Sequence, residues 1–129
     1  MLAKAKQRGI YDELHEVELV SFLQQHPASY DGVISADTLC YFGRLDGFCK
    51  AAHAALHPGG FTIFTVEKMP EDMSHDYRMQ DSGRYQHSAA YVRREMEGAG
   101  FEMLATNDVI LRQEGLDKVH GLICIGKAV

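Results

Sequence analysis

Several residue types that mark particular protein classes are scarce in this chain of 129 residues. It contains no tryptophan and only three cysteines, whose spacings match no zinc-binding motif. Because cysteines in apolar surroundings are usually buried free thiols, we expect a protein of the reducing cytoplasm. The first nine residues lack the apolar core of a signal peptide, and no apolar run reaches the roughly 18 residues of a membrane span, so we expect a soluble protein.

Basic residues are too few and too scattered for a nucleic-acid-binding surface. Thirteen Lys and Arg residues stand against eighteen Asp and Glu residues, which gives a formal charge of −5. Proteins that follow a phosphate backbone need a continuous basic patch, and no such run exists here. What the chain does have is 46% apolar and 24% charged residues, which is typical of a globular protein. We therefore expect one domain over residues 1–129.

The hydrophobic pattern alternates between the helical period and the strand period. Pro and Gly residues interrupt it, and residues 67–86 show no period and predict a long polar loop of the kind that often covers a site. No repeat or linker divides the chain. We expect helices over residues 1–8, 45–56 and 88–97, at most two helical turns within residues 21–26, and strands over residues 14–20, 32–36, 61–66, 101–114 and 121–129.

Alternating helices and strands indicate an α/β fold. The order favours an open Rossmann-like sandwich of three layers, with helices on both faces of a mostly parallel sheet. The last two strands, joined by the turn at residues 115–118, must form an antiparallel hairpin. In such sheets ligands bind beyond the carboxyl ends of the strands. Those ends carry Glu18, Asp37 with Thr38, and Glu67.

Three stretches together resemble a known family. A strand that ends in Ala36-Asp37 is followed by a helix, by the "HPGG" turn at residues 57–60 and by another strand, and the helix before "GAGFE" at residues 98–102 fits as well. This arrangement resembles class I S-adenosylmethionine-dependent methyltransferases, in a small-molecule branch often found beside tetratricopeptide repeats. The resemblance covers nearly the whole chain.

Two motifs of that family have no counterpart in this sequence. The family binds its cofactor with a glycine-rich turn after the first strand and with an acidic residue at the end of the second. The G-x-G at residues 98–100 follows a predicted helix and precedes a strand, which is the reverse of the required context. The resemblance therefore implies the later part of a methyltransferase domain, without the first two strands. In the family's strand order this loss exposes one edge of strand 32–36, so we expect that edge to pair with the displaced strand 14–20 or in a homodimer.

The resemblance also implies which residues would contact S-adenosylmethionine. Glu18 and Leu19 would lie at the adenine, and Ala36, Asp37 and Thr38 at the methionine and the transferable methyl group, where Asp37 would also be catalytic. Each acidic residue has an ordinary alternative. Glu18 could be a solvent-facing strand residue, and Asp37 could cap a helix.

Other residues are candidates for the side of the site that holds the methyl acceptor. Tyr41 could wall the pocket, Arg84 and Tyr85 could bind an anionic acceptor, and His87 could remove its proton. Simple loop solvation is the alternative. His53 and His57 have the spacing of a metal pair, but no Glu follows His53 as in a metalloprotease, and we expect no metal.

The predicted function is methyl transfer from S-adenosylmethionine to a small-molecule acceptor. The alternative is a non-catalytic fragment or interaction module that does not bind the cofactor by itself. Methyl transfer depends mainly on the cofactor's own reactivity and on alignment by the protein, so the lack of a catalytic triad does not argue against it.

Overall fold

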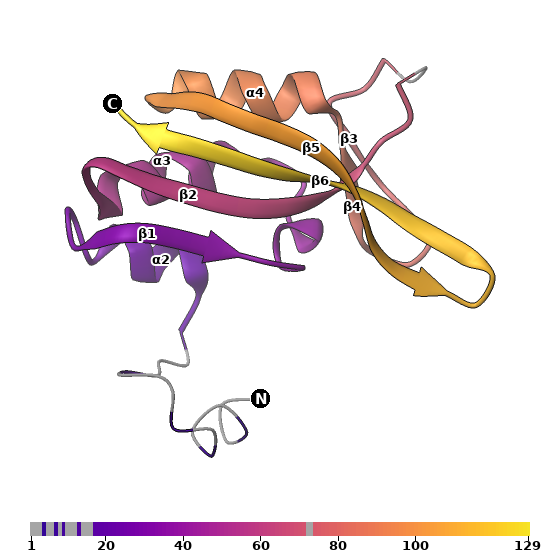
Figure 1. Ribbon diagram of the computed structural model, residues 1–129, viewed down its shortest axis with the longest axis horizontal. Helices are drawn as coiled ribbons and strands as arrows, with labels where there is room; N and C mark the ends of the chain where they lie inside the picture. The colour runs from indigo at the N-terminus through magenta and orange to yellow at the C-terminus, as the bar shows by residue number, and fades with distance from the viewer. Residues whose placement is uncertain (1–3, 5–6, 8, 10–12, 14–16, 72–73) are drawn as a thin grey trace.

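The described chain forms one mixed sheet with helices packed against it (Figure 1). The computed structural model describes residues 4, 7, 9, 13, 17–71 and 74–129. The elements in chain order are α2 (Leu19–Gln24), β1 (Tyr30–Ser35), the 3-10 helix η1 (Leu39–Tyr41), α3 (Asp46–Ala55), β2 (Leu56–Lys68), β3 (Tyr77–Met79), β4 (Tyr85–His87), α4 (Ala89–Gly98), β5 (Phe101–Glu114) and β6 (Asp117–Ala128).

The sheet has six strands, and β2 is its centre. The strand order is β3-β4-β2-β6-β5, and β1 pairs with β2 as well. Strands β1 and β4 run parallel to β2, at the start and the end of the same edge, whereas β6 runs antiparallel along the other edge. The β5–β6 and β3–β4 pairs are also antiparallel. The α/β class is confirmed, but the expectation of a mostly parallel sheet is wrong, because β6 runs antiparallel to both β2 and β5 and these two pairs contribute most of the pairing.

The described helices all lie on one face of the sheet. Figure 1 shows α2, α3 and α4 behind the strands, with the other face toward the viewer. On the helix side, the Phe48 and Phe64 rings meet edge to face with centroids 5.8 Å apart, and Leu122 and Cys124 are buried beside them. The expected third layer is absent from the described part of the chain. We call the uncovered side the open face; it carries Ile34, Phe61, Ile63, Ile123 and Ile125.

The "HPGG" turn works as predicted at the end of α3. The helix ends at Ala55, and β2 begins immediately at Leu56. Pairing with β1 then jumps from Tyr30 opposite Leu56 to Gly32 opposite Phe61, so residues 57–60 bulge out of the ladder. Gly59 has a φ of +84°, which a residue with a side chain rarely adopts. The bulge allows the chain to turn from helix into strand without a separate loop.

The amino-terminal strand is the clearest error of the sequence prediction. Residues 14–16 of the expected strand 14–20 and most of the expected helix 1–8 lie outside the described residues. Leu19 and Val20 are helical, and Glu18 caps α2 by accepting hydrogen bonds from the backbone N–H groups of Val20 (3.2 Å) and Ser21 (2.7 Å). An alternating apolar pattern this short does not distinguish a strand from a capped helix start.

The remaining expectations are largely confirmed. Helix α4 begins after Ser88, whose hydroxyl accepts a hydrogen bond from the Tyr91 N–H at 3.1 Å. The carboxyl-terminal hairpin forms, although β6 starts at Asp117 rather than residue 121. The polar segment 67–86 is more ordered than expected, because it contains β3 and leads into β4. No described helix is long and apolar enough to cross a membrane.

Candidate functional site

The carboxyl ends of the parallel strands β1 and β2 place two carboxylates at the same edge of the sheet. Asp37 follows β1 with a φ of +53°, a left-handed conformation that Asp tolerates better than most residues. Its N–H donates to the Thr65 hydroxyl of β2 at 3.0 Å, and the Thr38 hydroxyl donates to the Ala36 carbonyl at 3.1 Å. The turn after β1 is therefore fixed to β2, in which Glu67 is the residue before the last.

Arg112 of β5 joins these two strand ends. One guanidinium nitrogen lies 3.0 Å from an Asp37 carboxylate oxygen, and the other lies 2.8 Å from Glu67 Oε2. Its Nε is also 3.2 Å from Glu114. This forked geometry suits a guanidinium, whose N–H groups point in fixed directions. As a result, the long β5–β6 hairpin is held over the carboxyl edge of β1 and β2.

Glu67 is the buried centre of this polar cluster. Its side chain is only 2% exposed and accepts hydrogen bonds from Gln80 (3.0 Å), Arg84 (2.8 Å) and Arg112 (2.8 Å). Burial by itself raises the pKa of the Glu67 carboxyl, but these three hydrogen bonds outweigh it and hold the pKa below its usual range. Glu67 is therefore a charged carboxylate that organises donors from two hairpins.

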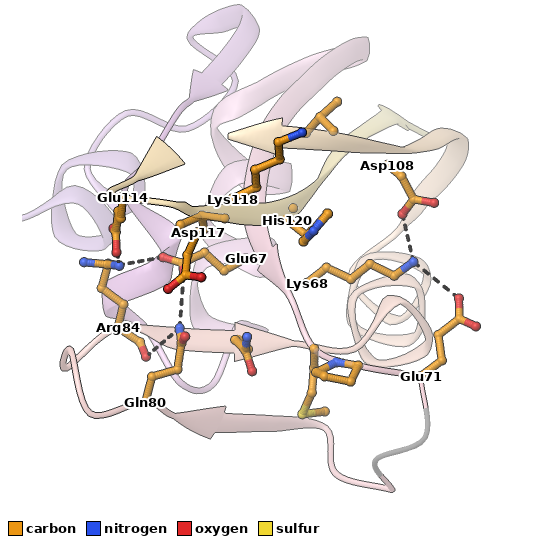
Figure 2. Close-up of a pocket in the computed structure, with 16 residues that line it drawn as sticks. Glu67, Lys68, Glu71, Gln80, Arg84, Asp108, Glu114, Asp117, Lys118 and His120 are labelled. Atoms are coloured by element: carbon orange, nitrogen blue, oxygen red, sulfur yellow. Dashed lines mark hydrogen bonds and ion pairs between the residues drawn. The ribbon is translucent and has the colours of Figure 1, made fainter. Parts of the chain in front are cut away.

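A pocket of about 620 Å³ opens beyond the end of β2. There β4 and β6, which pair with opposite edges of β2 at Glu67, separate from each other. Figure 2 shows Gln80 and Arg84 on the β3–β4 side and Asp117, Lys118 and His120 on the β6 side. The lining combines charged and amide side chains with apolar surface from residues such as Met69 and Val119, so the pocket suits a small ligand that has both apolar surface and hydrogen-bonding groups.

Lys68 forms a second ion-pair group at this pocket. Its ammonium lies 2.8 Å from Asp108 and 3.3 Å from Glu71, and these hydrogen bonds raise its pKa, the one from Asp108 most. The ammonium thus remains charged and bridges β5 to the segment after β2. Ion pairs with Arg84 and Lys68 therefore line two sides of the pocket.

The residues predicted to contact the cofactor lie in two separate places. Ala36, Asp37 and Thr38 form the exposed turn at the carboxyl edge, as expected. Glu18 does not end a strand, because its carboxylate caps α2, and hydrogen bonds from the Ser21 and Val20 backbone lower its pKa. Leu19 begins that helix and packs against the core.

The predicted acceptor-side residues are brought together only in part. Arg84 lines the pocket, but its guanidinium is already paired with Glu67 and with Glu114 at 2.7 Å. Tyr85 begins β4, and its ring packs against Tyr77 with centroids 5.9 Å apart. Tyr41, in η1, is 66% exposed. None of the predicted cofactor-contacting residues lines the 620 Å³ pocket.

His87 lies in the core rather than at a surface. Its ring is 0% exposed, and Nε2 donates a hydrogen bond to the Gly43 carbonyl at 3.0 Å. Nδ1 is buried, with no hydrogen-bond partner among the described residues. Burial lowers the pKa of His87, so the ring is neutral. In this structure it has no path to a substrate proton.

Sequence reasoning missed the β5 and β6 contributions to the site. The sequence prediction placed Asp108, Arg112 and Glu114 in a strand without any further role, and it assigned His120 to no element. Arg112 and Glu114 are two residues apart, so they project to one face of β5, and a pair of charges at this spacing in a strand is a usable signal. Only the folded hairpin shows that this face meets Glu67.

The described residues contain no group of three or more potential metal ligands. His53 and His57 do not share a helix face, since α3 ends before His57. His53 Nε2 lies 3.2 Å from the Val129 carbonyl, and His57 lies 3.6 Å from the Asp31 carboxylate.

Comparison with solved structures identifies proteins with the same arrangement of helices and strands. A methyltransferase from Methanosarcina mazei that depends on S-adenosylmethionine superposes with a TM-score of 0.72 at 16% identity, over 99% of this chain and 76% of its own. The fold resembles part of a methyltransferase domain. The 1,6-didemethyltoxoflavin-N1-methyltransferase of Burkholderia thailandensis, solved with 1,6-didemethyltoxoflavin and S-adenosylhomocysteine, gives 0.73 at 18% identity.

This chain spans only part of those neighbours. It covers 56% of the Burkholderia thailandensis methyltransferase and 61% of the [4+2]-cyclase SpnF, which superposes with a TM-score of 0.75 at 18% identity. No protein-family profile matches the sequence, and no curated protein matches it either. At these identities the likeness establishes the fold and leaves the reaction open.

Proposed function

We propose that this chain belongs to a system that transfers a methyl group from S-adenosylmethionine to a small-molecule acceptor, and that it supplies one wall of the site. The likeness to methyltransferase folds over nearly the full chain carries the proposal. The neighbour from Burkholderia thailandensis holds both a demethylated cofactor and a small molecule. The local support is the Asp37 turn at the carboxyl edge of β1 and β2, where ligands of such sheets bind.

The residues present fit one side of the cofactor. The turn from Ala36 to Thr38 is exposed at the strand ends, and Asp37 keeps one carboxylate oxygen beyond its bond to Arg112. The described residues contain no glycine-rich turn between a strand and a helix: Gly98 and Gly100 close α4, and Gly100 has a φ of +104°. Asp37 and Thr38 would hold the methionine end of S-adenosylmethionine. The other sides of the cofactor site would have to come from residues outside this sequence.

The contacts within the chain suggest which role each residue has in the proposed site. When bound, S-adenosylmethionine supplies the electrophilic methyl group. Arg112 pairs with both the Asp37 carboxylate and Glu67, so it connects the turn after β1 to the carboxylate that borders the pocket. In this proposal the acceptor binds in the pocket, and Arg84, which lines the pocket, contacts it there. His87, which is fully buried, is given no proton-transfer role.

A titration tests the cofactor part of the proposal. Isothermal calorimetry of the full chain with S-adenosylmethionine and with S-adenosylhomocysteine should show binding, weaker than in a complete site because this chain supplies only one wall of it. Asp37→Ala should weaken it at least tenfold, whereas Asp31→Ala, at the opposite end of β1, should leave it unchanged. No binding at millimolar ligand would overturn cofactor binding by this chain and favour the alternative of a non-catalytic module. Equal losses in both variants would remove Asp37 from the site.

Other parts of the proposal follow from composition and burial. The three cysteines are free and buried, which supports a cytoplasmic location. The net charge of −5 argues against a nucleic-acid partner. A homodimer through the exposed strand edge remains part of the proposal.

A further inference from the structure

A loop over residues 38–45 leads from the Asp37 turn to helix α3, and we call it the connecting loop. Its carboxyl end is anchored to α4, since the Leu45 N–H donates a hydrogen bond to the Tyr91 hydroxyl at 3.0 Å. Leu39 and Leu45 are fully buried. The connecting loop is thus part of the core, and a shift of this loop would move the exposed turn to which it is joined.

His87 of β4 binds the backbone of the connecting loop. It is 0% exposed, and Nε2 donates a hydrogen bond to the Gly43 carbonyl at 3.0 Å. Because a carbonyl only accepts hydrogen bonds, Nε2 carries the proton of the neutral ring, and Nδ1 carries none. Burial lowers the pKa of His87 more than the Gly43 and Phe42 carbonyls raise it, which keeps the ring neutral.

Backbone pairing fixes the position of His87 itself. The residue lies opposite Lys68 of β2 in a parallel pair and opposite Tyr77 of β3 in an antiparallel pair. Its carbonyl accepts a hydrogen bond from the Met69 N–H at 3.0 Å. The imidazole ring lies nearly parallel to the Tyr91 ring, with centroids 6.3 Å apart. The Nε2 donor is therefore held in place by its own surroundings, as a group that positions another segment must be.

Gly43 allows the connecting loop to come this close to the β3–β4 hairpin. A Cβ at this position would lie 2.9 Å from Tyr77 Cε2 and 3.0 Å from Tyr85 Cε1. The two rings meet at an angle of 71°, with centroids 5.9 Å apart. A side chain at position 43 would push the loop away from these rings. Glycine therefore lets the Gly43 carbonyl reach the His87 donor.

We infer that His87 is a positioning residue that fixes the connecting loop, and with it the Asp37 turn, to the β3–β4 hairpin. The same hairpin lines the pocket with Gln80 and Arg84. One hydrogen bond thus ties the turn proposed for the cofactor to the hairpin proposed for the acceptor. The effect of His87 on cofactor binding rests on the proposed function, whereas the attachment of the loop does not.

Amide hydrogen exchange of the full chain without ligand tests the attachment. The Tyr41 and Phe42 N–H groups report on the loop, because they bind the carbonyls of Thr38 and Leu39. Their exchange is compared with that of β6 amides, which report global unfolding.

Two variants of His87 separate its donor from its volume. Methionine and glutamine side chains have nearly the same length, but only glutamine keeps an N–H donor. In His87→Met the Tyr41 and Phe42 amides should exchange about tenfold faster, and in His87→Gln they should stay within about twofold of wild type. Unchanged exchange in His87→Met, or equal acceleration in both variants, overturns the role of the hydrogen bond.

A second pair of variants leaves His87 in place. Gly43→Ala introduces a Cβ against the Tyr77 and Tyr85 rings, whereas nothing lies within 4 Å of a Cβ at Gly47 in α3. Gly43→Ala should accelerate the same two amides, and Gly47→Ala should leave them unchanged. Equal exchange in the two alanine variants would contradict the close approach on which the hydrogen bond depends.

Calorimetry with S-adenosylhomocysteine tests the link to the cofactor. Under conditions in which circular dichroism shows every variant folded, His87→Met should weaken binding about threefold to tenfold, and His87→Gln should retain it. A purely structural role would lower the urea midpoint of His87→Met and leave the affinity of the folded chain unchanged, and that result would overturn the positioning role. If the wild type binds no ligand, the cofactor part of the proposed function fails, and the exchange rates alone decide whether His87 holds the loop.

Discussion

At the scale of single residues, the Glu67 carboxylate has the largest electrostatic role in the described chain. It is almost fully buried and binds two guanidinium groups. We expect Glu67→Gln to lower the free energy of unfolding by about 2–4 kcal/mol, because Arg84 and Arg112 would lose their shared counter-charge. Urea denaturation at pH 7 measures the loss.

The matched control is Glu114→Gln. Glu114 also pairs with both arginines, but its side chain is 49% exposed, so its loss should cost less than about 1 kcal/mol. Because the folded pKa of Glu67 is lowered, its stabilisation is present above the ordinary glutamate pKa and is lost as the pH falls through the folded value. The difference between wild type and Glu67→Gln should therefore shrink at pH 3. Equal effects of the two variants would contradict the central role of Glu67.

Because His87 is buried, we expect the free energy of unfolding to depend on pH near neutrality as well. Burial lowers its folded pKa, so just below the ordinary histidine pKa the unfolded chain binds a proton that the folded chain does not. The free energy of unfolding should therefore fall as the pH drops below about 6.5, by no more than about 1.4 kcal/mol per pH unit for this one group. Urea denaturation between pH 7.5 and pH 5.5 measures it.

The His87→Phe variant separates this proton from other groups. At pH 7.5 its free energy of unfolding should be lower than that of the wild type, because the hydrogen bond to the Gly43 carbonyl is lost. Its free energy of unfolding should change less between pH 7.5 and pH 5.5. His75→Phe is the control, since His75 is exposed and its replacement should leave the slope unchanged. A His87→Phe slope equal to that of wild type would show that His87 does not titrate between the two states.

At the scale of elements, close packing between strands constrains the β5–β6 hairpin. A Cβ on Gly121 would lie 2.5 Å from a Leu111 methyl carbon and 2.7 Å from the Val66 carbonyl oxygen. The carbonyl belongs to β2 and cannot move without breaking the ladder. Gly121→Ala should therefore lower the thermal midpoint and cost about 1–3 kcal/mol.

Gly98→Ala is the contrasting change. Nothing lies within 4 Å of a Cβ at Gly98, which ends α4. Alanine favours the helical conformation over glycine by roughly 0.5–1 kcal/mol, so this variant should be slightly more stable. Thermal unfolding of the two alanine variants side by side measures both effects. A stable Gly121→Ala would contradict the tight β2–β6 contact.

Elements with a long period were predictable, and short ones were not. Helix α3 follows its pattern closely, since its ten residues repeat the helical period, and strand β5 has its predicted bounds, 101–114. The segment that became α2 is too short to show a period, and a Glu side chain rather than a preferred capping residue begins it. β3 and β4 have three residues each and are defined by pairing with other strands rather than by their own sequence.

At the scale of the whole molecule, the open face is the feature with the broadest consequence. Its exposed apolar side chains are contiguous, unlike the isolated Leu116. Contiguous apolar surface binds hydrophobic dyes such as anilinonaphthalene sulfonate. We expect the native chain to enhance the dye's fluorescence at pH 7, and Phe61→Ser to reduce the enhancement by about half. Leu116→Ser should leave the signal unchanged, and equal reductions would mean that the dye binds elsewhere.

The candidate site, too, was predictable from the sequence only in part. Asp37 and Glu67 could be placed from the sequence because both lie at the carboxyl ends of parallel strands, and these ends share an edge of the sheet. The position of Arg112, which joins them, could not be predicted from the sequence, because Arg112 is 75 residues from Asp37. Arg84 was found as a candidate, but its pairing with Glu67 depends on β4 lying beside β2.

The sequence by itself determined the α/β class, the helix stop at "HPGG", the carboxyl-terminal hairpin and the two carboxylates at the strand ends. These depend on local period, backbone preference and strand direction. Only the tertiary structure decided the polar cluster, the pocket between the hairpins, the burial of His87 and the one-sided helix layer. Those features depend on contacts between residues far apart in the chain, which no local pattern encodes.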